Sequence, residues 1–194
     1  MKNTMLALGA ALVLTVAGCS SDSDSDSTAT EAATDAGSSA VETCPDAPGK
    51  ADASPQWTLA GATGELKVVA ATANEAPKIT VEAPFKVDET EVETLVEGDG
   101  EIVPENATVT VCYVGVNGRT GEEFDGTYRP GGSPATFSLD GVIAGFSKAI
   151  AGQKVGSQVA VAMTSADGYA QGQPAAGIEP GDTLVFEIGI LSAS

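Results

Sequence analysis

The fold is decided by a run of residues at positions 108–114, Thr108-Val109-Thr110-Val111-Cys112-Tyr113-Val114. β-Branched and aromatic residues favour strands, and the side chains of a strand alternate between its two faces. Val109, Val111 and Tyr113 therefore share one face, while Cys112 points to the other. The residues that follow, Asn117-Gly118-Arg119-Thr120-Gly121, are typical of a hairpin turn. The sequence thus predicts a strand that leads into an antiparallel hairpin.

Similar runs on both sides of this strand predict the rest of a sheet. Turn residues separate the further strands, which are expected at 66–69, 78–81, 91–96, 159–163 and 184–190. Only one segment has helical spacing, with Phe146, Ala149 and Ile150 on one side and Gly152 at the expected end. Several strands with one short helix predict an α+β fold, in which an antiparallel sheet covers the helix.

The composition excludes several kinds of active site. The 194 residues include 27 Asp and Glu but 9 Lys and Arg, so the formal net charge is −18. This charge argues against a nucleic-acid partner, which needs Lys and Arg at the phosphates. The chain has no His and three Cys, which excludes Ser–His or Cys–His nucleophile pairs and a cysteine-rich zinc site. No metal site and no cofactor are predicted, and the length allows one ordinary domain with appendages.

The first 18 residues are typical of a signal peptide. Lys2 precedes an apolar run from Met5 to Val16, which is too short to span a bilayer but suits an exported leader. The run ends in Val16-Ala17-Gly18-Cys19, which resembles the bacterial lipobox. That resemblance implies cleavage before Cys19 and diacylation of its thiol, which is enough for stable anchoring. The protein is then expected outside the cytoplasm, anchored to the bacterial cell membrane. The alternative is a plain signal peptide with an incidental Cys.

Two segments separate this leader from the predicted sheet. Residues 19–48 are rich in Ser, Asp, Ala and Thr, with acidic residues and no core-forming ones, and predict a disordered acidic tether. Residues 49–87 contain the first strands and have no enzymatic signature. They are expected to add one or two strands to the following domain, with a degenerate second domain as the alternative.

Three stretches, in this order and spacing, resemble one family. They are Val111-Cys112-Tyr113-Val114-Gly115 with Gly121-Glu122-Glu123-Phe124-Asp125, then Phe137-Ser138-Leu139-Asp140-Gly141-Val142-Ile143-Ala144-Gly145-Phe146, and then Gly168-Tyr169 with Gly177-Ile178-Glu179-Pro180-Gly181-Asp182-Thr183-Leu184-Val185-Phe186. The family is the FKBP-type peptidyl-prolyl cis-trans isomerases, and the resemblance covers about residues 88–192. It implies a curved antiparallel sheet wrapped around one short helix, in a domain at 88–194.

The resemblance also implies the residues of a proline pocket. Catalytic positions match Tyr113, Phe124, Asp125 and Tyr169. Substrate-binding positions match Val142, Ile143, Phe146, Ile178 and Phe186. Asp125 is expected to accept a hydrogen bond from a Tyr hydroxyl, and the Ile143 N–H and the Tyr169 hydroxyl to bind substrate carbonyls. Without the motif, the apolar members of this set would be interpreted as core residues.

The sequence departs from the family pattern at the pocket. Phe146 stands where the family usually has Trp, and Ala135 stands where a second aromatic residue is usual. The usual Tyr-Gly pair of the flap is Tyr169-Ala170 in this chain. We therefore expect a pocket that is wider and less aromatic than is typical.

The activity that the resemblance implies is rotation of X-Pro bonds, which needs no nucleophile and no general base. The expected substrates are proline-containing segments of exported proteins, acted on by a monomer. An alternative is a non-catalytic FKBP-like lipoprotein that binds proline peptides, and another is a structural spacer or adhesin.

Two cysteines remain besides Cys19. Thiols outside the membrane tend to oxidise, and Cys112 points away from the Tyr113 face toward the side that residues 44–85 could cover. A disulfide between Cys44 and Cys112 is therefore predicted. The alternative is two separate thiols, with Cys112 packed as a small hydrophobic residue.

Overall fold

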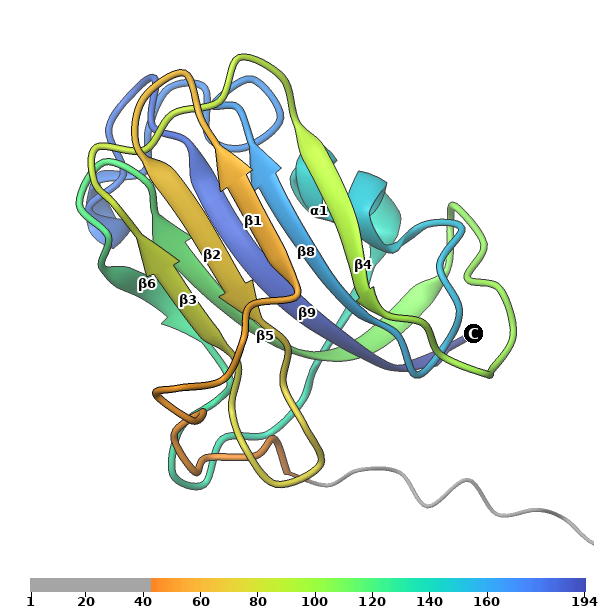
Figure 1. Ribbon diagram of the computed structural model, residues 1–194. Helices are drawn as coiled ribbons and strands as arrows, with labels where there is room; N and C mark the ends of the chain where they lie inside the picture. Colours follow the sequence, from red (N-terminus) through yellow and green to blue (C-terminus); the bar gives the residue numbers. More distant parts are fainter. Residues whose placement is uncertain (1–42) are drawn as a thin grey trace, which may run out of the picture. The chain divides into compact units, whose positions relative to one another are not determined.

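The computed structural model describes residues 43–194, which contain one large and one small antiparallel sheet (Figure 1). The large sheet has the strand order β4-β8-β9-β5-β6, and β7 also pairs with β5. Its strands are β4 (Glu91–Val96), β5 (Thr108–Asn117), β6 (Glu123–Gly126), β7 (Ala135–Ser138), β8 (Gln158–Met163) and β9 (Leu184–Ala193). The predicted strand at 108–114 is confirmed and extends to Asn117, where the hairpin to β6 begins. The predicted α+β class is confirmed as well.

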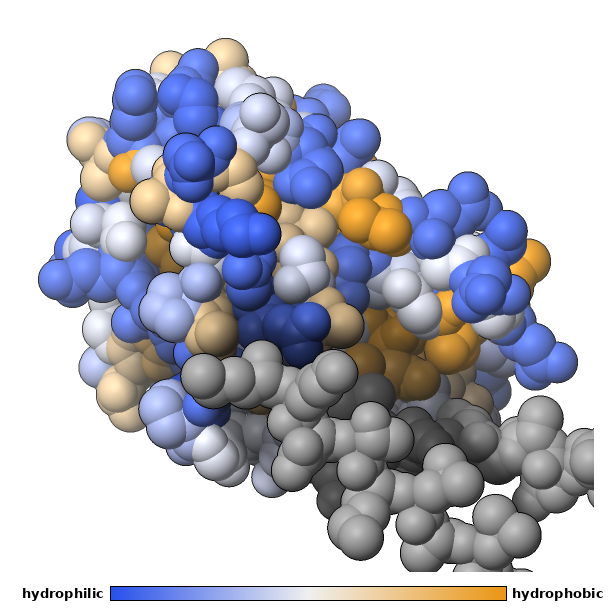
Figure 2. All heavy atoms as spheres, turned by 60° about the horizontal axis from the view of Figure 1, so that its bottom comes forward, coloured by the Kyte–Doolittle hydropathy of each residue, from blue (hydrophilic) through white to orange (hydrophobic). Residues whose placement is uncertain are grey.

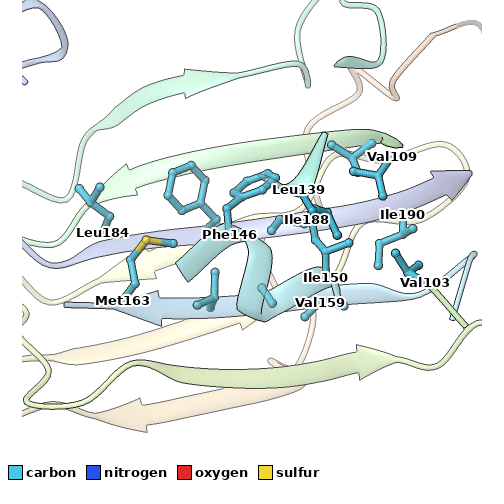
Figure 3. Close-up of a cluster of buried hydrophobic side chains, with 14 of the residues drawn as sticks. Val103, Val109, Leu139, Phe146, Ile150, Val159, Met163, Leu184, Ile188 and Ile190 are labelled. Carbon is cyan, nitrogen blue, oxygen red and sulfur yellow. The ribbon is translucent and has the colours of Figure 1, made fainter. Parts of the chain in front are cut away.

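The one α-helix within residues 43–194, α1 (Ala144–Ile150), packs on one face of the large sheet. Phe146, Ala149 and Ile150 are buried, as their spacing predicts. Gly152 follows the helix with a φ of 80°, a conformation that glycine adopts without strain. Figure 3 shows the side chains of this core between helix and strands, including Val159 of β8 and Ile188 of β9. The described residues also contain two short 3₁₀ turns. The first, η1 (Leu139–Gly141), lies between β7 and α1, and the second, η2 (Pro174–Ala176), lies between β8 and β9.

The opposite face of the large sheet is covered by the small sheet, as Figure 1 shows for β1 to β3. This sheet consists of β1 (Trp57–Ala60), β2 (Glu65–Val69) and β3 (Lys78–Val81). One or two strands added to the domain were expected in this region, and the structure has three, which pair only with one another. Leu66 and Val68 alternate on one face of β2 and are fully buried. The small residues Ala160 and Ala162 of β8 lie in the same cluster and let the two sheets approach closely.

Residues 43–48 were expected to belong to a disordered tether, but the structure shows them in contact with the domain. Cys44 forms a disulfide with Cys112 of β5, and Ala47 forms a β-bridge with Glu75. These two links hold the segment against the two sheets. The signal peptide, Cys19 and the rest of the predicted tether lie outside the described residues. None of the helices in the described part of the chain is long and apolar enough to cross a membrane.

Candidate active site

An open pocket of about 440 Å³ lies between the large sheet and the beginning of α1. Eight of the nine predicted site residues line it, namely Tyr113, Phe124, Asp125, Val142, Ile143, Phe146, Tyr169 and Phe186. They come from three strands, from the helix, from the η1–α1 junction and from the loop after β8. The fold thus brings together side chains that are up to 73 positions apart in the sequence.

The floor of the pocket consists of aromatic rings that meet edge to face. Phe146 and Phe186 are both 4% exposed, and their ring centroids are 5.4 Å apart at 89°. Tyr113 meets Phe146 at 5.8 Å, and Phe124 meets Phe186 at 5.5 Å. Such T-shaped contacts fix the ring orientations because ring edges are positive and ring faces negative. The result is a rigid apolar surface of a size that suits a small ring.

Phe137 is a lining residue that the sequence analysis did not place in the site. It lies on β7, and its ring is 5.5 Å from that of Phe146 and 6.2 Å from that of Tyr113. Ala135 and Phe137 are two positions apart and both half-buried, whereas Thr136 between them is exposed. The period-2 rule could have identified this shared face. Phe137 thus supplies a ring on the strand that carries Ala135, and the expectation of a pocket less aromatic than is typical stays a prediction.

Ile178 is the one predicted site residue outside the pocket lining. It is 2% exposed and belongs to the core between the sheet and α1. Gly177 precedes it with a φ of 69°, and Ile178 forms a β-bridge with Gln173. These constraints direct its side chain into the core. Ile178 therefore supports the loop between Gln173 and β9 and does not line the pocket.

Tyr113 and Asp125 form the polar part of the wall. The Tyr113 hydroxyl donates a hydrogen bond of 2.7 Å to Asp125 Oδ2, as the sequence analysis expected. The Gly126 N–H donates to the other carboxylate oxygen, Oδ1, at 2.9 Å. Burial raises the pKa of Tyr113 well above its ordinary value, and the Asp125 carboxylate raises it further. The phenol therefore stays protonated and oriented at all physiological pH values.

Two hydrogen-bond donors at the rim remain available to a ligand. Ile143 is the N-cap of α1, and its carbonyl accepts from the N–H groups of Phe146 and Ser147. No residue in the range 43–194 accepts a hydrogen bond from the Ile143 N–H or from the Tyr169 hydroxyl. Both residues line the pocket. The site can thus present two donors to carbonyl oxygens of a bound peptide.

The loop that carries Tyr169 is tied to the helix and to β4. Asp167 accepts hydrogen bonds from Lys148 at 2.7 Å and from the Thr90 hydroxyl at 2.6 Å. These two donors lower the pKa of Asp167, so its carboxylate remains charged. The Gly145 N–H in α1 also donates to the Asp167 carbonyl. The position of Tyr169 over the pocket is thus supported from two sides.

No group of three or more potential metal ligands occurs within residues 43–194. The polar groups of the pocket are one carboxylate, two phenols and main-chain groups. This set can orient a peptide and donate hydrogen bonds to it. It contains no paired nucleophile and base, so its chemistry is binding and polarisation.

Several known proteins are similar to part of this chain. Residues 99–191 match the family model described as FKBP-type peptidyl-prolyl cis-trans isomerase. The chain is 39% identical over 93 residues to an "FK506-binding protein" of Streptomyces anulatus, covering 46% of this chain and 74% of the relative. It is 33% identical over 122 residues to a "Probable FK506-binding protein" of Corynebacterium glutamicum, covering 61% of this chain and 99% of that relative. A solved peptidyl-prolyl cis-trans isomerase from Pseudomonas syringae pv. tomato is 31% identical with a TM-score of 0.48, covering 54% of this chain and 75% of that chain.

Proposed function

This chain belongs to the FKBP-type peptidyl-prolyl cis-trans isomerases, and we propose that its aromatic pocket is where the bond before a proline rotates. The observation that carries the proposal is the rigid box of Tyr113, Phe146 and Phe186, open to solvent and flanked by two unbonded donors. The box offers an apolar seat to a pyrrolidine ring. The donors of Ile143 and Tyr169 can hold the peptide on either side of it.

The rate acceleration follows from the difference between the planar and the twisted amide. Rotation of an X-Pro bond crosses a barrier of roughly 18–20 kcal/mol because amide resonance is lost, and it takes tens to hundreds of seconds unaided. The planar amide has the larger dipole and is the form that water solvates better. Transfer into an apolar pocket therefore disfavours the planar form more than the twisted form. Only such differential binding lowers the barrier.

The named residues have distinct roles in this mechanism. Phe146, Phe186 and Val142 contact the proline ring. The Tyr113–Asp125 pair forms a wall whose hydroxyl is already oriented, so no reorganisation is needed when the amide twists. The Ile143 N–H and the Tyr169 hydroxyl donate to substrate carbonyls. No proton is transferred, which agrees with a chain that has no His.

A protease-coupled assay on a proline-containing peptide tests the proposal. We expect isomerisation by the wild-type chain, with kcat/KM lower by about fivefold in Tyr169→Phe, because one hydrogen bond worth about 1 kcal/mol is lost. Asp125→Asn should weaken the acceptor of the Tyr113 hydroxyl and lower kcat/KM by a similar factor. Asp140→Asn is the matched control, since Asp140 is exposed and outside the pocket lining. A wild-type rate equal to the uncatalysed rate would disprove the proposal.

We also propose that the enzyme works outside the cytoplasm on exported proteins, anchored through a diacylated Cys19. The support is the Val16-Ala17-Gly18-Cys19 motif after an apolar run. All residues that line the pocket lie between Tyr113 and Phe186 of one chain. A single anchored copy therefore has a complete site, which is consistent with a monomer.

The anchor has a direct test in cells that express the full chain. Metabolic labelling with a clickable palmitate analogue should label the wild-type protein, which should sediment with the membranes. Cys19→Ser should abolish both the label and the sedimentation, because the acylated atom is the Cys19 sulfur. Ser20→Ala is the matched control and should keep both. Equal labelling of wild type and Cys19→Ser would contradict the anchor.

A further inference from the structure

The outer edge of β4 is one of the two unpartnered edges of the large sheet, and the other is at β6. β4 pairs with β8 on one side, and no strand in residues 43–194 pairs with its other side. In an antiparallel strand, alternate residues turn their N–H and C=O groups outward. An unpaired edge of this kind is a template for an added strand. We call residues 88–105, which comprise β4 and its flanking loops, the acidic edge.

The acidic edge combines negative charge with exposed apolar side chains. Every charged residue in it is acidic and exposed, namely Asp88, Glu89, Glu91, Glu93, Glu97, Asp99, Glu101 and Glu105. It also contains the three exposed large hydrophobic residues of the described chain, Val92, Val96 and Ile102. Figure 2 shows one face of the molecule, which is mostly polar with apolar residues in a few places. A groove of about 320 Å³ adjoins the edge between Thr94, Ile102 and Lys154.

The charges determine which strand this edge can accept. Charged residues on an edge strand commonly prevent pairing with a second copy, because like charges then lie opposite each other. Glu91 and Glu93 share one face of β4, while Val92 and Thr94 share the other. Neither Glu91 nor Glu93 forms an ion pair within residues 43–194, whereas Glu97 pairs with Lys154. The complementary strand is therefore one in which basic and apolar residues alternate, with the basic ones beside the glutamates.

The edge begins beside the loop that carries Tyr169. Thr90 directly precedes β4, and its hydroxyl donates to Asp167 at 2.6 Å. The Thr164 N–H donates to the same hydroxyl at 3.2 Å. Asp167 is two residues before Tyr169 in the same loop. A polypeptide that lies along β4 can therefore continue toward the rim of the pocket.

We propose that the acidic edge binds an extended segment of the polypeptide substrate in which basic and apolar residues alternate, as a strand added to β4. This inference rests on the proposed isomerase function. Binding at the edge makes entry of a nearby proline into the pocket intramolecular, which raises its effective concentration. The edge then selects among X-Pro substrates by the segment that precedes or follows the proline.

Two substrates with the same X-Pro core separate the edge from the pocket. One is a short proline peptide, and the other is this peptide joined by a Gly/Ser linker to a segment of alternating lysine and valine. We expect the extended substrate to have a lower KM by about fivefold or more at an unchanged kcat. Glu91→Lys with Glu93→Lys should remove this advantage and leave the short peptide unaffected. High salt should reduce the advantage as well.

Controls distinguish the edge from general electrostatic attraction. Asp46→Lys with Asp52→Lys makes the same change in net charge at exposed positions outside the acidic edge and should keep the advantage. A peptide with the lysines and valines in separate blocks should show no advantage, because its side chains do not match the two faces of β4. Equal KM values for the short and extended substrates, or equal effects of the two double variants, would overturn the proposal.

A binding measurement keeps this test separate from the isomerase assay. The probe is a fluorescent peptide of alternating lysine and valine without proline. Its fluorescence anisotropy should increase when the wild-type chain is added and should not increase with Glu91→Lys/Glu93→Lys. If the short peptide is not isomerised but the alternating peptide still binds, the isomerase proposal fails and the proposal that the acidic edge binds such a peptide is retained. If the short peptide is isomerised but the alternating peptide does not bind, the edge proposal fails alone.

Discussion

Glu187→Gln is expected to make the folded chain more stable by about 4 kcal/mol at pH 8, and to change its stability little at pH 4.5. Glu187 lies on β9 and is completely buried on the face of the large sheet opposite to α1. Its Oε1 accepts from the Ala71 N–H at 3.1 Å, whereas Oε2 has no partner within residues 43–194. A charged carboxylate in this place lacks the contacts that water would provide.

The pKa of Glu187 gives the direction and the pH range of the effect. Burial raises this pKa from 4.5 to about 8, and the Ala71 N–H and the nearby Tyr128 hydroxyl oppose the shift only in part. At a pH between 4.5 and about 8, Glu187 keeps its proton in the folded chain and releases it in the unfolded chain. The free energy of unfolding therefore falls by about 1.4 kcal/mol for each pH unit in this range. A glutamine does not titrate, so the free energy of unfolding of the variant should not fall with pH for this reason.

Urea unfolding of both chains at several pH values between 4.5 and 8 measures the effect. The difference between the variant and the wild type should increase steadily with pH. Glu91→Gln is the matched control, because Glu91 is exposed, and it should reproduce the wild-type pH dependence. A pH dependence of Glu187→Gln parallel to that of the wild type would contradict the buried, protonated carboxyl.

Reduction of the Cys44–Cys112 disulfide is expected to lower the free energy of unfolding by about 4 kcal/mol. The two residues are 68 positions apart in the sequence. A cross-link that closes a loop of this length removes conformational entropy from the unfolded chain by about that amount. After reduction, the main-chain hydrogen bond from the Cys44 N–H to the Gly132 carbonyl is a weaker link than the disulfide. The N-terminal segment should therefore become more sensitive to proteases at the same time.

The measurement is chemical unfolding with and without reductant in a Cys19→Ser background, where Cys44 and Cys112 are the remaining cysteines. Cys44→Ala with Cys112→Ala is the control, because its stability should not respond to reductant. The prediction fails if both thiols of the reduced chain can be alkylated under native conditions without a change in the unfolding midpoint.

The periodic elements could be predicted because their signals are local. The strand at 108–114 and the helix ending at Gly152 have side-chain patterns that match their burial. The strand at 91–96 formed as predicted, but five of its six residues are exposed, so its alternation did not predict its burial. Strands β6 and β7 have four residues each and were not among the expected strands. Phe137 was quoted in the family motif but not placed in the pocket, although its alternation with Thr136 could have indicated a face shared with Ala135.

The contacts of single side chains could not be predicted in the same way. Ile178 occupies a motif position, but its bridge to Gln173 directs it into the core. Glu187 is part of an apolar run from Leu184 to Ile190, and nothing in the run indicates that it faces Ala71. The contact between Glu187 and Ala71 joins residues 116 positions apart, so it depends on how the two sheets stack.

The sequence by itself determined the class of the fold, because strand and helix periodicity and turn chemistry depend on near neighbours. Most residues around the pocket were indicated by the resemblance of its motifs to the family. Only the tertiary structure decided that the residues before Asp88 form a second sheet, that Phe137 completes the aromatic box, and that β4 keeps an unpaired acidic edge. These features depend on which surfaces meet when distant segments pack. Packing of that kind follows from the shapes of whole layers and leaves no periodic signal along the chain.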